Sequence, residues 1–446
     1  MKINFIKLLY EEENNMRKNK GITLVALVVT IVVLLILAGV SINLVLGNNG
    51  IIAKAKDAET KSAEASQNDL KGMNGLVSEM EGALAGNGST GSGSGNGGAG
   101  GSGADTKVPA EATAETAPYF PDNTFTKKEG TIDTGLVIQD ASGNEYVWVV
   151  VPKSLYNNTN YNSNNTKKPS SSTDYANIEY CLQQYTVTYR NGTSFFDVYY
   201  ADDKNVGWFA DATAYNNLKN SMLKSVYENG GFYVGRYEAG IDTTTGTNRT
   251  SIESQVDGKY PVPTTAPVTK ADAYPYTYVT RTQAQNLASN VNSGTKTSSL
   301  MFGVQWDLVL AFMHNKGNIA DSTLTSNSTT IGNYKNNLWT IKNANAKYST
   351  DYGRTFTACP NPFKKDADSK VLLTTGADSS FSVQNIYDIA GNVYEWTLEK
   401  TDRGSLPCAQ RGGDFYDTGS GSPAAKRNNF YTFSTDYSIG FRVTLW

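Results

Sequence analysis

The order of apolar and polar positions separates an N-terminal helical part from the rest of the chain. Residues 22–46 carry no charge over 25 positions, which is long enough to cross the hydrocarbon core of a membrane. Residues 51–83 then show spaced apolar positions among Lys and Glu, a pattern typical of a solvated helix. We predict a transmembrane helix over 22–46 and a helical stalk over 47–83.

A stretch without apolar periodicity follows the stalk. Fourteen of the 20 residues from 86 to 105 are Gly or Ser, which cannot bury enough surface to fold and behave as a loose coil. We therefore predict a flexible linker over 84–118 and one globular domain over 119–446.

Strand and helix patterns mix in this domain without regular alternation. The β-branched and glycine-flanked runs at 146–152 and 230–240 predict buried strands, and apolar residues at helical spacing predict helices at 281–291 and 304–314. Residues 153–228 show little periodicity, so no element is predicted there. Such a mixture favours an α+β fold over a parallel sheet.

The segment 414–438 departs from every core pattern. Its 25 positions contain no Val, Ile, Leu or Met, and eighteen of them are Asp, Phe, Tyr, Thr, Ser or Asn. Aromatic rings supply rigid contact area and short polar side chains supply adaptable hydrogen bonds, as in antibody paratopes. The segment therefore predicts a ligand-binding surface, although an irregular surface loop with a few buried rings, Phe415 among them, would have a similar composition.

The residues predicted to contact the ligand all have polar or aromatic side chains. They are Asp414, Tyr416, Asp417, Ser420, Ser422, Asn428, Asn429, Phe430, Tyr431, Phe433, Ser434, Asp436, Tyr437 and Ser438.

The amino-acid composition limits the partners and the metal sites that the chain can have. A net charge of −3 and a pI near 5.5 give no electrostatic basis for nucleic acid as a partner. Three cysteines are an odd number that makes no disulfide framework, and the sequence does not say whether two of them pair. The single histidine, His314, rules out histidine-rich metal sites.

The N-terminus resembles that of type IV prepilins. Lys20, Gly21 and Ile22 precede the apolar run as a basic leader and its processing site do in that family. The resemblance implies a leader over 1–21, cleavage between Gly21 and Ile22, and contacts with other pilin subunits. Ala26 stands where the family carries a Glu that pairs during filament assembly, so polymerisation is left open, and a simple one-pass anchor explains the same residues.

The C-terminal half resembles the formylglycine-generating enzyme family. Residues 385–399, the Arg411-Gly412-Gly413 triplet and residues 439–443 match its segments in the right order, and Trp306 falls at its helix tryptophan. The resemblance implies a C-type-lectin-like fold on the N-terminal helix. The residues given a structural role are Trp306, Asn392, Glu395, Trp396, Arg411, Gly412, Gly413, Gly440, Phe441 and Arg442.

Two finer expectations concern these structural residues. We expect Arg442 to pair with Glu395 or Asp388 and thereby to hold the last strand. The family can also hold a structural calcium near Asn392 and Glu395, and oxygen ligands suit that ion. Buried hydrogen bonding is the alternative role for both residues.

Catalysis is not expected. Enzymes of this family bind copper through two cysteines that follow the Arg-Gly-Gly triplet, because thiolates are the soft ligands this metal prefers. No cysteine lies beyond Cys408, which precedes Arg411. We therefore predict no cofactor and no catalytic residue, with an oxidase that uses other residues as the alternative.

Segment 414–438 also resembles the variable region of diversity-generating retroelement proteins, which lies between the same Arg-Gly-Gly and Gly-Phe-Arg landmarks. Substituting adenines in Asn codons yields almost all of its residues, while Lys426 and Arg427 fit poorly and residues 423–425 read as fixed framework. We predict a membrane-anchored adhesin or receptor on a bacterial surface that binds a variable external protein or cell-surface molecule. A structural minor pilin is the remaining alternative.

Overall fold

The computed structural model describes residues 111–190, 195–201 and 208–446. The predicted leader, transmembrane helix and stalk, and the linker up to residue 110, lie outside these residues. In the described part of the chain, no helix has both the length and the apolar character needed to span a membrane.

The larger sheet of the domain has six strands, and each neighbouring pair is antiparallel. The run 146–152 forms its centre, where β-branched side chains pack on both faces and are almost wholly buried. In spatial order the strands are β1 (Thr126–Glu129), β2 (Val137–Gln139), β3 (Glu145–Val150), β5 (Gly231–Gly235), β20 (Val443–Leu445) and β8 (Ser298–Leu300).

The second sheet carries the segment 414–438. Its longest strand pairs with β17 and β4 in the antiparallel sense and with β19 in the parallel sense. The chain leaves this sheet at Arg411 and returns to it as β18, which is an edge strand. Its strands are β18 (Arg427–Phe430), β17 (Cys408–Arg411), β16 (Tyr394–Thr401), β19 (Ile439–Phe441) and β4 (Phe195–Phe196).

Short two- and three-stranded sheets complete the β structure. β10 lies between β11 and β13, and the remaining short strands form two-stranded pairs, β12 with β9, β14 with β15 and β6 with β7. Their bounds are β6 (Gly240–Ile241), β7 (Tyr274–Pro275), β9 (Thr340–Ile341), β10 (Lys347–Ser349), β11 (Thr357–Ala358), β12 (Phe363–Lys364), β13 (Leu372–Leu373), β14 (Ser382–Val383) and β15 (Ile386–Tyr387).

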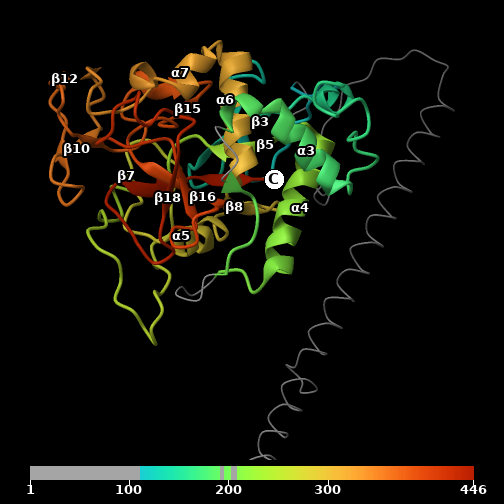
Figure 1. Cartoon of the computed structure of the whole chain (residues 1–446). Helices are drawn as coiled ribbons and strands as arrows, with labels where there is room; N and C mark the ends of the chain where they lie inside the picture. Colours follow the sequence, from blue (N-terminus) through green and yellow to red (C-terminus); the bar gives the residue numbers. More distant parts are fainter. Residues whose placement is uncertain (1–110, 191–194, 202–207) are drawn as a thin grey trace, which may run out of the picture. The chain divides into compact units, whose positions relative to one another are not determined.

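Five α-helices lie in the described residues: α3 (Tyr175–Tyr185), α4 (Ala212–Asn229), α5 (Arg281–Ala288), α6 (Gly303–Gly317) and α7 (Asp321–Thr325). The expected helices at 281–291 and 304–314 are confirmed as α5 and α6. Thr280 and Gln283 form a capping box that starts α5. In Figure 1, α3 and α4 lie on one side of the domain, and β10 and β12 lie on the opposite side.

Helices α3 and α4 fall in the region where no element was predicted. Outside their buried positions α3 is rich in Tyr and Gln and α4 in Asn, Ser and Lys, and only three or four residues of each helix are buried. Asp211 starts α4 by accepting a hydrogen bond from the Ala214 N–H (2.8 Å), and Gly230 ends it at φ +69°. Each helix has too few apolar residues at helical spacing for the sequence pattern to predict it.

The boundary predicted between linker and domain is corrected by the structure. Thr116 is buried; its hydroxyl donates to the Gly230 carbonyl (2.7 Å) and accepts from Trp148 Nε1 (2.8 Å). The Ala117 N–H donates to the Asn229 carbonyl (2.7 Å). Residues 111–118 therefore belong to the domain and not to the linker.

Candidate binding surface

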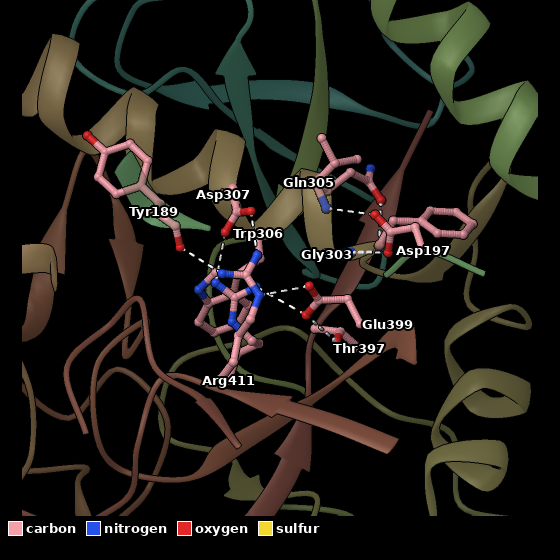
Figure 2. A network of polar contacts seen from close by, with 12 residues as sticks. Tyr189, Asp197, Gly303, Gln305, Trp306, Asp307, Thr397, Glu399 and Arg411 are labelled. Atoms are coloured by element: carbon pink, nitrogen blue, oxygen red, sulfur yellow. Dashed lines mark hydrogen bonds and ion pairs between the residues drawn. The ribbon is translucent and has the colours of Figure 1, made fainter. Parts of the chain in front are cut away.

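Segment 414–438 is anchored at its base by four buried charged side chains, here called the charge tetrad: Asp307 of α6, Glu399 of β16, Arg411 of β17 and Arg427 of β18. Arg411 Nη2 lies 2.9 Å from Asp307 Oδ1 and Nη1 lies 3.2 Å from Glu399 Oε2. Arg427 reaches the other oxygens of the same two carboxylates at 2.5 and 2.9 Å. Figure 2 shows Arg411 between Asp307 and Glu399.

The tetrad is closed to solvent and balanced in charge. Each of its four side chains is at most 4% exposed. Burial acts to raise the pKa of Glu399, but the Arg427 and Arg411 guanidinium groups outweigh it and the pKa is lowered. Because each charged group of the tetrad is paired with others of the tetrad, the tetrad holds the strands together and has no free charge to bind a ligand.

A framework of hydrogen bonds fixes the middle of the segment. Trp306 Nε1 donates to the Ala424 carbonyl (3.0 Å), and the Ala424 and Ala425 N–H groups donate to Ser328 Oγ and the Leu324 carbonyl, both at 2.9 Å. Both alanines are buried. The expectation that residues 423–425 are framework agrees with this packing.

Gly412 and Gly413 start the segment with φ values of +91° and +82°. A Cβ atom at Gly413 would lie 2.4 Å from the Ser422 carbonyl oxygen, so no larger side chain fits there. This tight backbone path accounts for the structural role given to the glycine pair.

Three of the predicted contact residues, Asp414, Ser422 and Ser438, are buried. Asp414 Oδ1 accepts the N–H groups of Tyr416 (2.8 Å) and Asp417 (3.0 Å), and Ser422 Oγ is 2.9 Å from the Tyr394 hydroxyl. Burial, and secondarily the Asp417 charge, raise the pKa of Asp414 to about 7. The structure corrects the prediction for all three, because their side chains lie beneath the surface.

A cluster of three tyrosines, the exposed Tyr352 and the half-buried Tyr416 and Tyr437, forms one part of the segment and its surroundings. The Tyr352 and Tyr416 rings stack with centroids 5.6 Å apart, and Tyr437 meets them at 4.8 and 5.7 Å. Lys370 Nζ lies 4.1 Å from the centroid of the Tyr416 ring, a cation–π contact. Phe415, 1% exposed, packs below this tyrosine cluster as a core residue, as expected.

A second group of rings begins with Phe430, the last residue of edge strand β18, and continues with Tyr431 and Phe433. Tyr431 and Phe433 are 42% and 45% exposed, and their ring centroids lie 5.5 Å apart. Phe430 is half-buried and packs against Trp396 of the core. The other predicted contact residues have no bulky side chain; Ser420 is exposed, and Asp417, Asn428, Asn429, Ser434 and Asp436 are half-buried.

Two contributors were missed in the sequence. Tyr352, 42% exposed, sits at the turn of the β10–β11 hairpin with φ +67°, and Lys370 precedes β13. The turn is held by Ser349 Oγ, which accepts the Gly353 N–H (3.0 Å), and by Asn248, which donates to the Gly353 carbonyl (2.5 Å). Only the fold brings Tyr352 and Lys370 to Tyr416, and no local pattern could have indicated it.

The last strand is held as expected. Arg442 is buried and donates to both oxygens of Glu395 at 2.6–3.1 Å, as well as to the Gly235 carbonyl (3.0 Å). Of the two partners predicted for Arg442, Glu395 is the observed one. Trp396, 1% exposed, donates from Nε1 to the Val279 carbonyl (2.9 Å), and Phe441 is fully buried.

The residues expected near calcium do not fit that ion. Asn392 Oδ1 already accepts from Asn333 Nδ2 and from the Leu373 N–H, both at 3.1 Å, and Asn392 Nδ2 donates to Glu238 (2.7 Å). Both oxygens of Glu395 are occupied by Arg442. The alternative of buried hydrogen bonding therefore replaces the calcium prediction.

Comparison with known proteins decides the family. The profile of the FGE-sulfatase family, the sulfatase-modifying factor enzyme 1-like domain, matches residues 137–445. The chain belongs to this family. The predicted resemblance is thus confirmed for the domain, together with its mixed α/β, C-type-lectin-like fold.

Two further comparisons concern curated proteins and solved structures. A search of curated proteins gives no match. Solved structures with similarity include PvdO from Pseudomonas aeruginosa (14% identity, TM-score 0.32, 72% of this chain and 99% of that one) and CarF (15%, 0.24, 56% and 95%). Another is Treponema denticola variable protein 1 (17%, TM-score 0.19, 59% of this chain and 80% of that one).

The copper chemistry implied by the FGE-sulfatase resemblance does not fit the donors in this chain. Cys181 of α3, Cys408 of β17 and Cys359, which follows β11, are all buried, and none is in a disulfide. Burial raises the pKa of the Cys181 and Cys359 thiols to about 11, which disfavours the thiolate that binds metal. Among the described residues, no group of three or more His, Cys, Asp or Glu side chains is placed to hold a metal ion.

Proposed function

We propose that the domain binds an external ligand through the two ring groups of segment 414–438. Tyr352 and Lys370, which lie outside this segment, contribute to the same surface. One observation carries the proposal: Tyr352, Tyr431 and Phe433 expose 42–45% of their surface above a fully bonded, buried framework. Grouped exposed rings are uncommon on soluble monomers and mark interaction surfaces. Rings held on a rigid base lose little entropy on binding, as in mature antibody paratopes.

The proposal extends to diversification of this surface. The framework includes the two residues that fit the Asn-codon set poorly, Lys426 and Arg427, and the alanines of 423–425. Tyr431 and Phe433, in contrast, are exposed. Sequencing the gene tests this part. We expect Asn-type codons at the exposed positions and a nearby near-copy that differs at adenines, and ordinary codons with no near-copy would refute it.

We further propose that the domain is a non-catalytic adhesin or receptor, held at a bacterial surface by the helix predicted at 22–46. The buried, separate cysteine thiols described above support the absence of a copper-dependent oxidase activity. Metal analysis of the purified chain, with an oxidase assay on thiol peptides, tests it: stoichiometric copper together with turnover would favour the enzyme.

Photocrosslinking in the native cell tests the binding surface directly. A benzophenone amino acid replaces Tyr431 or Phe433 in the full chain, and Leu338, an exposed apolar residue outside the segment, serves as the matched position. We expect a discrete covalent adduct from Tyr431 and Phe433 and none from Leu338. Equal labelling from all three positions, or none from the first two, would refute the proposed surface.

A further inference from the structure

A polar cavity of about 470 Å³ has no residue of segment 414–438 in its lining, so an inference about it does not rest on the function proposed above. It is bounded by the loop after β6, the loop before β7 and the base of the β10–β11 hairpin. Its charged lining residues are Asp242, Lys270, Asp272 and Lys347, and the methyl groups of Ala271, Ala273, Ala344 and Ala358 leave the space between them open.

Two of these four charges satisfy each other. Lys270 Nζ lies 3.1 Å from Asp242 Oδ2, and Asp242 Oδ1 accepts both the N–H (2.9 Å) and the hydroxyl (2.6 Å) of Thr244. Hydrogen bonds from Thr244, more than the Lys270 charge, lower the pKa of Asp242 to about 2. This pair is thus part of the wall and has little capacity left for a ligand.

The other two charges have no ionic partner in the described part of the chain. Lys347 Nζ lies 3.2 Å from the Tyr274 hydroxyl and over its ring, without a carboxylate in reach. Asp272 Oδ1 accepts from Asn343 Nδ2 (2.8 Å), and Oδ2 has no donor among the described residues. Burial raises the pKa of Asp272, with Asn343 and Lys347 acting against it. The cavity therefore contains one cation and one anion that act on each other electrostatically but form no ion pair within the described residues.

We propose that this cavity binds a small zwitterion of about dipeptide size, whose carboxylate meets Lys347 and whose ammonium meets Asp272. Charge-assisted hydrogen bonds at both ends would be stronger than neutral ones. The volume lies in the range of small-molecule sites, and the alanine methyl groups suit short side chains. A molecule with only one charge would leave one of the two protein charges unpaired.

Calorimetric titration of the full chain with alanyl-alanine tests the site. We expect one site per chain, with a dissociation constant of about 1 mM or tighter. N-acetylalanine, which lacks the ammonium, and alanine amide, which lacks the carboxylate, are expected to bind at least tenfold more weakly. Absence of alanyl-alanine binding, or equal binding of all three molecules, would overturn the proposal.

Variants separate this cavity from adventitious binding elsewhere. Lys347→Met and Asp272→Asn remove one charge each, and Asn tolerates the left-handed backbone of Asp272 at φ +61°. Each is expected to weaken alanyl-alanine binding tenfold or more. Asp257→Asn, at an exposed residue with φ +51°, is the matched control and should bind as the parent chain does. Unchanged affinity in the first two variants would overturn the assignment.

Discussion

At the residue scale, Arg427 shows how one side chain divides a binding segment into framework and surface. The next two residues, Asn428 and Asn429, are half-buried, whereas the side chain of Arg427 is 4% exposed and contacts both acids of the charge tetrad. Arg411 alone would leave one oxygen of each acid without a cation. Two arginines on adjacent strands are thus needed for two carboxylates, which accounts for a fixed basic residue inside an otherwise polar and aromatic run.

Replacing Arg427 by Leu is expected to destabilise the fold by about 3–5 kcal/mol, because buried Asp307 and Glu399 would keep a net negative charge. Lys426→Leu, one residue earlier and only half-buried, is the control and should change the free energy of unfolding by less than about 1 kcal/mol. Urea unfolding of both variants measures the difference. Equal effects would contradict the role given to the tetrad.

At the element scale, the β10–β11 hairpin is the part of the fold that completes the proposed binding surface. Its base lines the polar cavity, and its turn places Tyr352 against Tyr416 and Tyr437. A bulky residue at φ +67° is rare outside strained or functional turns. The surface is therefore built from two distant segments, and only the C-terminal one has an unusual composition.

Tyr352→Asn removes the ring and suits the left-handed backbone, so it should leave stability nearly unchanged. We expect it to weaken binding of the partner captured at Tyr431 by about tenfold, the usual effect of losing an aromatic anchor. Tyr352→Phe should retain most of the affinity, and Leu338→Ala should have no effect. If Tyr352→Asn binds as tightly as the parent chain, the hairpin is not part of the surface.

Residues 111–118 give a second prediction at this scale. A chain that starts at 119 leaves Trp148 Nε1 and the Gly230 carbonyl without Thr116, and an unsatisfied buried polar group costs about 1–3 kcal/mol. We expect it to unfold at lower urea concentration than a chain that starts at 111. A chain that starts at 100 should match the latter, and equal midpoints for all three would show that the linker does extend to 118.

The sequence predicted elements where local pattern and burial agree, as in the central strand at 146–152 and the helix at 304–314. It failed where burial is decided by distant partners. Helix α4 buries only four side chains, and Asp414 and Ser422 look exposed until Tyr394 and the backbone of 416–417 are in place. Polar residues that bond a neighbouring loop have the same local signature as residues that face a ligand.

At the scale of the whole molecule, buried carboxyl groups set how stability depends on pH. Asp197, Asp388 and Asp414 each have a pKa raised from 3.8 to about 7, and burial is the largest cause in every case. Nearby acids add to it, Glu399 beside Asp197 and Asp417 beside Asp414. In the unfolded chain these groups lose their protons near pH 4.

The folded chain therefore binds more protons than the unfolded chain between about pH 4 and pH 7, and its free energy of unfolding must fall as pH rises through this window. We expect a higher urea midpoint at pH 5 than at pH 8. Asp414→Asn keeps the oxygen that accepts the N–H groups of 416 and 417 but cannot ionise, so its midpoint should fall less. Asp257→Asn, at an exposed residue, is the control, and its urea midpoint should fall by as much as that of the parent chain. A midpoint of the parent chain that is constant or rises from pH 5 to pH 8 would contradict the assignment of these buried acids.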